Sequence, residues 1–304
     1  MESKLLQRIK AKIRLVLGVT ALEEKYESLY FLLNNVIDIT QLPKTRNKNL
    51  RQLQQCDTVL LAIFDKLCRK YGLTYWLDGG TLLGAYRHKG FIPWDDDSDV
   101  TMPREEMNRV IPLMKNDAES YGLTISTASL HPLRCLIISY QKEKTGVWLD
   151  IFPLDHYITD DSKETVSQKV YQYYQFFWKN LNKSAEYLTA KKKDIFSSSK
   201  YGEYHYLLGA LEQWVGQTKT YIYEEKIIFP IKRIQFEGFE FNVPNDTNAY
   251  LTSLYDKDYM KFPRNAINTH GAADSPAYRA KANGIDMDEV YQQLMDIYNK
   301  ITVD

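Results

Sequence analysis

The stretch YWLDGGTLLGAYRHKGFIPWDDDSDVTMPRE, residues 75–105, carries the strongest structural signal in this 304-residue chain. A β-prone run over 73–77 stops at a double glycine, and TLLGAYRH over 81–88 favours a helix. DSDVTM over 97–102 alternates as a strand does. The stretch therefore predicts a strand, a glycine turn, a helix and a second strand that delivers four aspartates within five positions.

Asp97 and Asp99 are the centre of this acidic cluster. In a strand, residues two apart point to the same face with Cα atoms about 6.5 Å apart, so both carboxylates can reach one cation. Carboxylates this close repel unless a divalent ion, an arginine or a proton compensates them. Because Mg²⁺ commonly takes one or two carboxylates together with substrate phosphates, the spacing predicts a phosphate-handling Mg²⁺ or Mn²⁺ site. Asp150, in a strand predicted over 146–154, is the expected third carboxylate, as metal ligand or as proton acceptor.

The glycine turn beside the cluster predicts a phosphate site. Gly79 and Gly80 let the backbone approach a phosphate, and Thr81 offers a hydroxyl and helix-start amides to its oxygens. Asp95 is expected to support the site from a turn, whereas Asp96 is expected to point away from it.

Three basic residues follow the turn. Arg87 is the expected source of positive charge for the reaction, ahead of His88 and Lys89 as weaker choices. Together with the carboxylates and the glycines, they make a metal and phosphate site the favoured interpretation of the whole stretch.

A calcium-binding module is one alternative. Asp95, Asp97, Asp99 and Glu106 match positions 1, 3, 5 and 12 of an EF-hand loop. Position 6 is Val100, which disfavours the sharp turn that glycine makes there, and FIPW before the cluster is not an incoming helix.

A nucleotide-sugar glycosyltransferase is the second alternative, with DSD as the Asp-x-Asp motif that holds Mn²⁺ under a diphosphate. Such enzymes place a βαβ nucleotide-binding half before that motif, and residues 1–72 have a helical pattern instead.

The chain divides into three predicted parts. They are a helical, basic amphipathic N-terminal appendage at 1–46, a catalytic core at 47–160, and a helix-rich part with a β-hairpin at 161–304, which we expect to bind substrate. Within them the pattern predicts helices over 48–71, 247–255 and 288–301, strands over 133–140 and 146–154 joined by a turn, a helical aromatic stretch over 161–228, and a hairpin over 234–244.

Composition limits the function classes. Lys plus Arg and Asp plus Glu number 39 each, so no global field argues for a nucleic acid partner. Cys56, Cys68 and Cys135 form no C-x-x-C pair and predict buried thiols in a reducing compartment, which favours the cytoplasm. The sequence contains no apolar run of about 18 residues, the length that would predict a membrane span. Residues 1–17, with an apolar face and five basic residues, predict contact with the inner surface of the cell membrane.

GGTLLGAYRHKGFIPWDDDSDVTMPRE resembles the core motif of the LicD family, whose fold is similar to that of the nucleotidyltransferase superfamily. LDIFPLD at 149–155 and the segment at 229–263 extend the resemblance over roughly residues 50–270. The superfamily pattern is a glycine turn, two carboxylates one residue apart and a third on a later strand, which Gly79, Gly80, Asp97, Asp99 and Asp150 match in order. This chain has YDKDYM where the family often has a glycine, and only His270, expected to bind substrate, where a pair of histidines often follows.

The resemblance implies an α+β fold, with a nucleotidyltransferase-like mixed β-sheet flanked by helices. It also implies metal-dependent transfer of a phospho-alcohol, phosphocholine first, from a CDP-activated donor such as CDP-choline. The acceptor would be a sugar hydroxyl of a cell-surface glycan, such as lipopolysaccharide, teichoic acid or capsule, or of its lipid-linked precursor.

Choline would call for an aromatic cage, because ring faces bind quaternary ammonium groups. Trp76, Trp94, Trp148 and the aromatic residues at 171–178 are available for one, and their spacing does not single out a set. CDP-ribitol or CDP-glycerol would need hydroxyl-binding groups instead.

Overall fold

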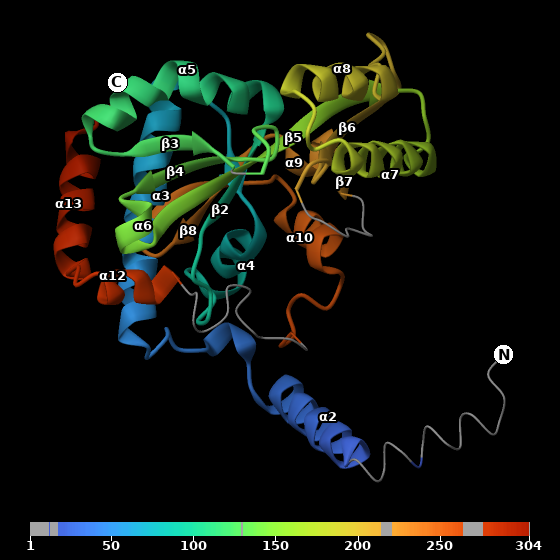
Figure 1. The fold of residues 1–304 in the computed structure, drawn as a ribbon. Helices are drawn as coiled ribbons and strands as arrows, with labels where there is room; N and C mark the ends of the chain where they lie inside the picture. The colour runs from blue at the N-terminus through green and yellow to red at the C-terminus, as the bar shows by residue number, and fades with distance from the viewer. Residues whose placement is uncertain (1–11, 13–17, 129, 214–220, 264–275, 304) are drawn as a thin grey trace.

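A mixed β-sheet lies at the centre of the chain, in a computed structural model that describes residues 12, 18–128, 130–213, 221–263 and 276–303 (Figure 1). Its strands are β1 (Trp76–Leu77), β2 (Asp99–Pro103), β3 (Thr124–Thr127), β4 (Leu136–Tyr140), β5 (Val147–Thr159), β6 (Tyr204–Gly209) and β7 (Tyr221–Glu224). Within the described residues the order is β1-β2-β5-β4-β3, and β6 and β7 continue the sheet from the far half of β5. Helices flank this sheet, which confirms the predicted α+β class.

The long strand β5 organises the sheet, because β2, β4 and β6 all pair with it. β2 runs parallel to its first half, with Asp99 level with Asp150 and Pro103 level with Leu154. β4 and β6 are antiparallel to its first and second halves respectively. The register therefore sets the two predicted carboxylates side by side on neighbouring strands.

The helix α3 (Lys48–Tyr71) packs against β5, and its bounds agree with the predicted helix. The side chain of Asn47 caps its start by accepting a hydrogen bond from the Leu50 N–H. Gly72, at φ 61°, ends it in the left-handed conformation that glycine adopts readily. The apolar face of α3 is buried, and α13 (Met287–Lys300) packs along it (Figure 1).

The other elements surround the sheet. α5 (Arg104–Ser120) packs on β5 and β3, and α10 (Thr247–Tyr255) packs against α4 (Gly79–His88). The predicted hairpin is confirmed as β8 (Lys232–Phe236) and β9 (Phe239–Val243), which form a separate sheet. The shorter elements are η1 (Ile39–Gln41), α6 (Lys142–Thr145), α9 (Glu225–Ile228), η2 (Pro276–Tyr278) and α12 (Arg279–Ala282).

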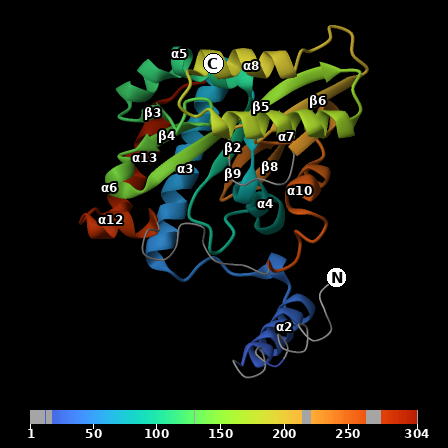
Figure 2. The same ribbon diagram turned by 45° about the vertical axis from the view of Figure 1, so that its right-hand side comes forward.

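The helical interpretation of 161–228 was right for its first half only. α7 (Lys163–Lys179) and α8 (Ala185–Ile195) lie over the far half of β5 and over β6 (Figure 2), and with them they bury a second apolar cluster. β6 and β7 then extend the central sheet, so the part beyond residue 160 shares that sheet with the part before it. Short aromatic and apolar runs such as YHYLLG fit a strand as well as a helix, and pairing with β5 decides between them.

Two local predictions near the acidic cluster also need correction. β2 begins at Asp99 and not at residue 97, because a turn in which the Asp95 N–H donates to the Ile92 carbonyl at 3.0 Å precedes it. Asp97 therefore lies in the loop before the strand, and strand alternation does not set its direction. The turn predicted after β4 contains the short helix α6.

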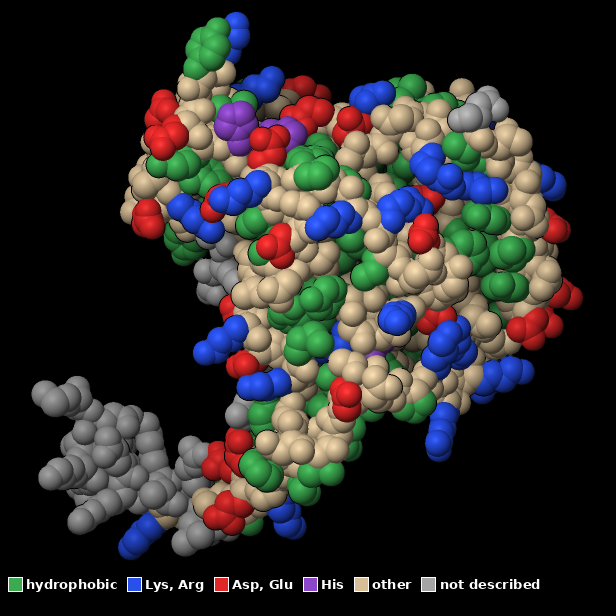
Figure 3. All heavy atoms as spheres, turned by 180° about the vertical axis from the view of Figure 1, so that it is seen from behind, with side chains coloured by type: hydrophobic (Ala, Val, Ile, Leu, Met, Phe, Trp, Pro, Cys, Tyr) green, Lys and Arg blue, Asp and Glu red, His purple; other side chains and the backbone are tan. Residues whose placement is uncertain are grey.

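α2 (Val19–Val36) projects away from the body in both ribbon views (Figures 1 and 2), and none of its residues is buried. Leu22, Leu29 and Val36 expose more than half of their surface. Residues 1–11 and 13–17, most of the segment expected to touch a membrane, lie outside the described residues. Across the described part of the chain, every helix is too short or too polar to cross a membrane. From behind, acidic and basic side chains are interspersed (Figure 3).

Candidate active site

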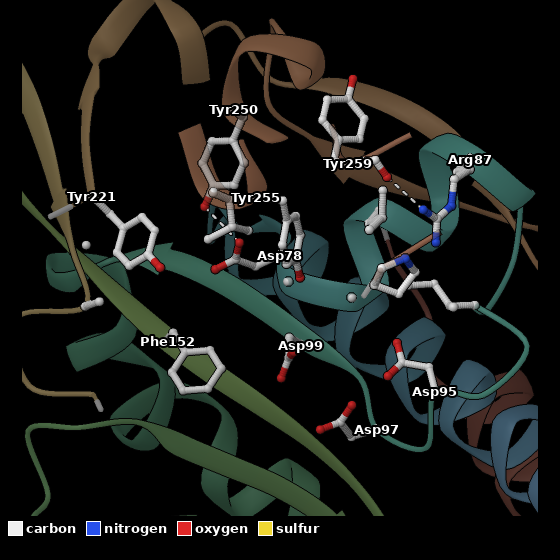
Figure 4. Close-up of a pocket in the computed structure, with 18 of the residues that line it drawn as sticks. Asp78, Arg87, Asp95, Asp97, Asp99, Phe152, Tyr221, Tyr250, Tyr255 and Tyr259 are labelled. Carbon is white, nitrogen blue, oxygen red and sulfur yellow. Dashed lines mark hydrogen bonds between the residues drawn. The ribbon is translucent and has the colours of Figure 1, made fainter. Parts of the chain in front are cut away.

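A cavity of about 680 Å³ opens beside the edge of the sheet formed by β1 and β2. Its walls come from the start of α4, the loop before β2, the strands β5 to β7, α10 and the segment at 258–263. Figure 4 shows Asp78 among the rings of Tyr221, Tyr250 and Tyr255, with Asp97 and Asp99 below them and with Asp95 and Arg87 at the right of the view. This volume is within the range of small-molecule sites, about 300–1,000 Å³.

The double glycine makes room for the carboxylates. A Cβ added at Gly79 would lie 2.6 Å from Oδ2 of Asp99, and one at Gly80 would collide with Oδ2 of Asp95. Gly79 also has φ +53°, which residues with a side chain rarely adopt. Since both carboxylates lie at the N-terminal end of α4, the helix dipole favours their negative charge. The glycines line the cavity, and they also let two acidic side chains approach the start of α4.

Asp150 lies beside Asp99, but outside the cavity lining. The Asp150 N–H donates to the Ser98 carbonyl at 3.1 Å, which ties β5 to the acidic loop. The Trp148 indole N–H donates to Oδ2 of Asp150 at 3.1 Å. The third carboxylate therefore supports the acidic cluster from the neighbouring strand, held in one direction by the indole.

Crowding and burial make the cluster costly to ionise. Burial raises the pKa of Asp99 well above its ordinary value, and the neighbouring carboxylates, Asp97 before Asp150, raise it further. Burial likewise raises the pKa of Asp95, with Asp97 next, and only the charge of Arg87 opposes the shift. Within the described residues, Oδ2 of Asp95 has no hydrogen-bond partner. A cation bound here would offset this repulsion.

Two carboxylates, rather than a complete protein cage, are what the cluster offers a metal ion. Among the residues that the structure describes, no three His, Cys, Asp or Glu side chains form a ready metal site. Mg²⁺ needs only one or two protein carboxylates when phosphates and waters complete its shell. Asp97 and Asp99, which line the cavity and repel each other, fit that arrangement.

Arg87 reaches the cavity from α4. Its Nη1 donates to the Tyr259 carbonyl at 2.7 Å and its Nε donates to Nε2 of His88 at 2.9 Å. Burial lowers the pKa of Arg87 to about 10, so it remains charged at neutral pH. Burial and the charge of Arg87 lower the pKa of His88 to about 4, which leaves that imidazole neutral to accept the bond.

Some of the remaining predicted site residues line the cavity and others do not. Trp94 lines the cavity beside Asp95. The Thr81 hydroxyl instead accepts the Asp99 N–H at 2.9 Å, and Lys89 is exposed at the end of α4, outside the cavity lining. His270 lies outside the described residues.

The aromatic residues of the cavity differ from most of those singled out in the sequence. Trp76 is in the core, Trp148 lies outside the cavity lining, and α7 buries Tyr173 and Phe177 in the second apolar cluster. The rings that line the cavity with Trp94 are Tyr30, Phe152, Tyr221, Tyr223, Tyr250, Tyr255, Tyr259 and Phe262. Four of these tyrosines lie in the aromatic runs YIY of β7 and AYLTSLY of α10.

Two carboxylates near the site also escaped the sequence interpretation. Asp78, directly before the glycines, lines the cavity. Asp57 of α3 is 1% exposed, and its Oδ1 has no hydrogen-bond partner in the described part of the chain. Burial, and next the charge of Asp97, raise the pKa of Asp57 well above its ordinary value. The acidic cluster thus extends into the core.

The described structure does not match the calcium-binding module or the nucleotide-sugar glycosyltransferase considered from the sequence. An EF-hand loop lies directly between two helices and turns sharply at position 6, whereas here residues 99–103 of the candidate loop form the strand β2, and α4 ends at His88, well before the loop. The βαβ half expected of a glycosyltransferase is also missing before the acidic motif in the described residues, where α2, η1 and α3 come first.

Comparison with known proteins finds relatives over the same region. A model of the LicD/FKTN/FKRP nucleotidyltransferase domain matches residues 72–184. The lipopolysaccharide cholinephosphotransferase LicD of Haemophilus influenzae is 30% identical over 255 residues, which are 70% of this chain and 92% of that protein. The ribitol 5-phosphate transferase FKRP of Homo sapiens is 45% identical over 49 residues, 16% of this chain and 10% of that protein. An uncharacterized protein of Rickettsia typhi is 32% identical over 106 residues, 32% of this chain and 33% of that protein.

Proposed function

Because this chain belongs to the LicD family, we propose that it transfers a phospho-alcohol group, phosphocholine first, from a CDP-activated donor to a sugar hydroxyl of a cell-surface glycan or its lipid-linked precursor. The observation that carries the proposal is the pair Asp97 and Asp99 in a cavity next to the glycine turn. The cholinephosphotransferase relative, similar over 70% of this chain, supports the class of group transferred.

Asp97 and Asp99 would hold a Mg²⁺ or Mn²⁺ ion, which supplies charge neutralisation to a bound diphosphate. Arg87 adds a fixed positive charge from the cavity wall, close enough to Asp95 to oppose the rise in the pKa of that carboxyl caused by burial. The backbone at Gly79 and Gly80 lets phosphate oxygens approach the start of α4. These groups hold the donor for in-line attack by the sugar hydroxyl.

In the transfer, a bond forms between the sugar oxygen and the phosphorus of the phospho-alcohol. The bond from that phosphorus to the bridging oxygen breaks, and CMP leaves with the electron pair. The hydroxyl proton passes to a carboxylate base, and Asp150 takes this role or completes the metal shell. Asp150→Asn separates the two roles, since a lost ligand weakens Mg²⁺ binding and a lost base slows turnover alone.

The test is release of CMP in the presence of both CDP-choline and a glycan acceptor. We expect Asp97→Asn and Asp99→Asn each to abolish release without lowering the melting temperature, because each change removes a repelling charge. Asp161→Asn, which removes a partly exposed carboxylate paired with Lys169 away from the cavity, is the matched control. EDTA should stop the wild-type reaction, and Mg²⁺ should restore it.

Activity that persists in EDTA, or in either aspartate variant, contradicts the metal assignment. Pyrophosphate released from a nucleoside triphosphate would instead identify a nucleotidyltransferase, and UDP released from a UDP-sugar would identify a glycosyltransferase.

A further inference from the structure

The cavity has an ordered distribution of charge. At one end, Arg87 provides a buried positive charge held by the Tyr259 carbonyl (Figure 4). Asp97 and Asp99 lie toward the middle, and Asp78 lies beyond them among aromatic rings. A ligand that spans the cavity therefore meets a cation first, then the proposed metal site, then a carboxylate surrounded by rings.

Aromatic side chains surround the Asp78 end. Tyr221, Tyr255 and Phe152 line the cavity there, and Tyr255 leaves 40% of its surface accessible (Figure 4). Behind them the ring of Tyr250 stacks on that of Tyr223, with centroids 4.3 Å apart and planes at 10°. Both stacked rings are almost fully buried, so the wall behind the exposed rings is rigid.

Neutral groups provide the hydrogen bonds to Asp78. The Tyr250 hydroxyl donates to its Oδ1 at 3.0 Å, the Thr101 hydroxyl donates to its Oδ2, and the Gly79 N–H donates as well. Within the described residues no Lys, Arg or His forms an ion pair with this carboxylate. Burial raises the pKa of Asp78 and these three hydrogen bonds oppose that rise, so a cation bound in the cavity would favour the charged carboxylate.

We propose that Asp78, Tyr221, Tyr255 and Phe152 form a subsite for a quaternary ammonium group, the cationic end of the transferred phospho-alcohol. This inference rests on the proposed function, which puts the phosphates at Asp97 and Asp99. Ring faces attract such a cation, and a carboxylate that lacks an ionic partner complements its charge. In phosphocholine only two methylene groups separate the phosphate oxygen from the ammonium, so a phosphate at Asp99 keeps the ammonium near the rings.

The same subsite disfavours a polyol. A ribitol or glycerol chain needs a hydrogen-bond partner for each hydroxyl, whereas the faces of the rings are carbon surface and, within this subsite, polar atoms are limited to the two tyrosine hydroxyls and the Asp78 carboxylate. A hydroxyl buried against these rings without a partner would lose affinity, whereas a methylated ammonium has no N–H or O–H to satisfy.

The test measures dissociation constants for CDP-choline, CDP-ribitol and CMP by calorimetry with Mg²⁺. We expect the wild-type protein to prefer CDP-choline over CDP-ribitol by on the order of tenfold, as a desolvated cation–π site allows. Asp78→Asn and Tyr255→Leu should each weaken CDP-choline binding by about tenfold and leave CMP binding unchanged. Tyr255→Phe keeps the ring and is the matched variant that retains the preference.

Three results would overturn the subsite. Equal affinity of the wild-type protein for both CDP-alcohols would show that this end does not recognise a cation. An equal loss of CMP and CDP-choline binding in Tyr255→Leu would show that the rings hold the cytosine base instead. Loss of CDP-choline binding in Tyr255→Phe would assign the effect to the hydroxyl. In each case the wild-type protein still binds CDP-alcohols, whereas a wild-type protein that binds none of them would reject the proposed function itself.

Discussion

Replacing Gly79 with alanine tests whether the glycine turn serves the acidic pair. Gly79 has φ +53°, where a residue with a side chain costs about 1–2 kcal/mol of folding free energy. The added Cβ would lie 2.6 Å from Oδ2 of Asp99, closer than such contacts tolerate, so the carboxylate must move by several tenths of an ångström. Misplacement of a reacting group by about 1 Å costs roughly 100-fold in rate, so we expect turnover to fall by about ten- to 100-fold.

Gly72→Ala is the matched control for backbone strain. Gly72 has φ +61° at the end of α3, and a Cβ there would meet no atom within 4 Å. Both variants should therefore lose a similar free energy of unfolding, with melting temperatures lowered by about 2–4 °C. Only Gly79→Ala should also lose turnover and Mg²⁺ affinity, measured by CMP release and by calorimetry.

Equal turnover in the two variants would refute this reasoning, because it would show that the position of Asp99 does not matter. A loss of turnover with Mg²⁺ affinity unchanged would refute the metal role of Asp99 and leave only a steric effect on the donor.

The remaining predictions concern residues that support the site. Although burial alone would raise it, the charges of Arg104 and Lys192 hold the pKa of Asp155 well below its ordinary value. A lowered folded-state pKa stabilises the fold above the unfolded value of about 4, and this stabilisation fades as pH falls through the folded value. Asp155→Asn should thus lower the free energy of unfolding by about 3 kcal/mol at pH 7. In urea unfolding, the difference in this free energy between the variant and the wild type should shrink below about pH 4. A difference that stays constant with pH would contradict the role given to the Asp155 charge. Trp148→Phe removes the indole N–H that holds Asp150 and should slow CMP release by about tenfold, since a hydrogen bond to a charged group is worth about 1.5–3 kcal/mol. Trp178→Phe, at an indole whose N–H has no partner within the described residues, should leave the rate unchanged, and equal effects of the two changes would argue against orientation of the carboxylate.

Helices and strands could be predicted from the sequence where several local signals agree. The apolar stripe over 48–71 and Gly72 after it were enough to predict α3, because both are short-range signals, and the structure adds Asn47 as its cap. β6 could not be identified in this way, since its aromatic run fits either period and only pairing with the distant strand β5 selects the strand. The start of β2 was misplaced for a related reason: the turn at Ile92 and Asp95 competes with strand alternation.

The residues of the candidate site likewise fall into those that local sequence signals indicate and those that only the tertiary structure brings together. Asp97 and Asp99 could be proposed as metal ligands because two carboxylates close to a glycine turn stand out in a short window, and Asp150 was added as an acidic residue in a later predicted strand. The ring environment of Asp78 could not, because Tyr221, Tyr250 and Tyr255 arrive from elements more than 140 positions away in the sequence. The proposed ammonium subsite is therefore assembled by tertiary packing, whereas Asp97 and Asp99, the proposed metal ligands, lie two positions apart in the chain.

The acidic cluster and the double glycine, which look like two separate motifs, form one structural unit. Gly79 and Gly80 each occupy the position where a side chain would collide with an aspartate oxygen, of Asp99 and Asp95 respectively. The Thr81 hydroxyl then accepts the Asp99 N–H, which fixes the start of β2 against the first turn of α4. A glycine turn that only cradled phosphate would leave the carboxylates free to move apart and relieve their repulsion. Here the packing holds them together before any ligand binds, so the repulsion that remains favours the binding of a cation.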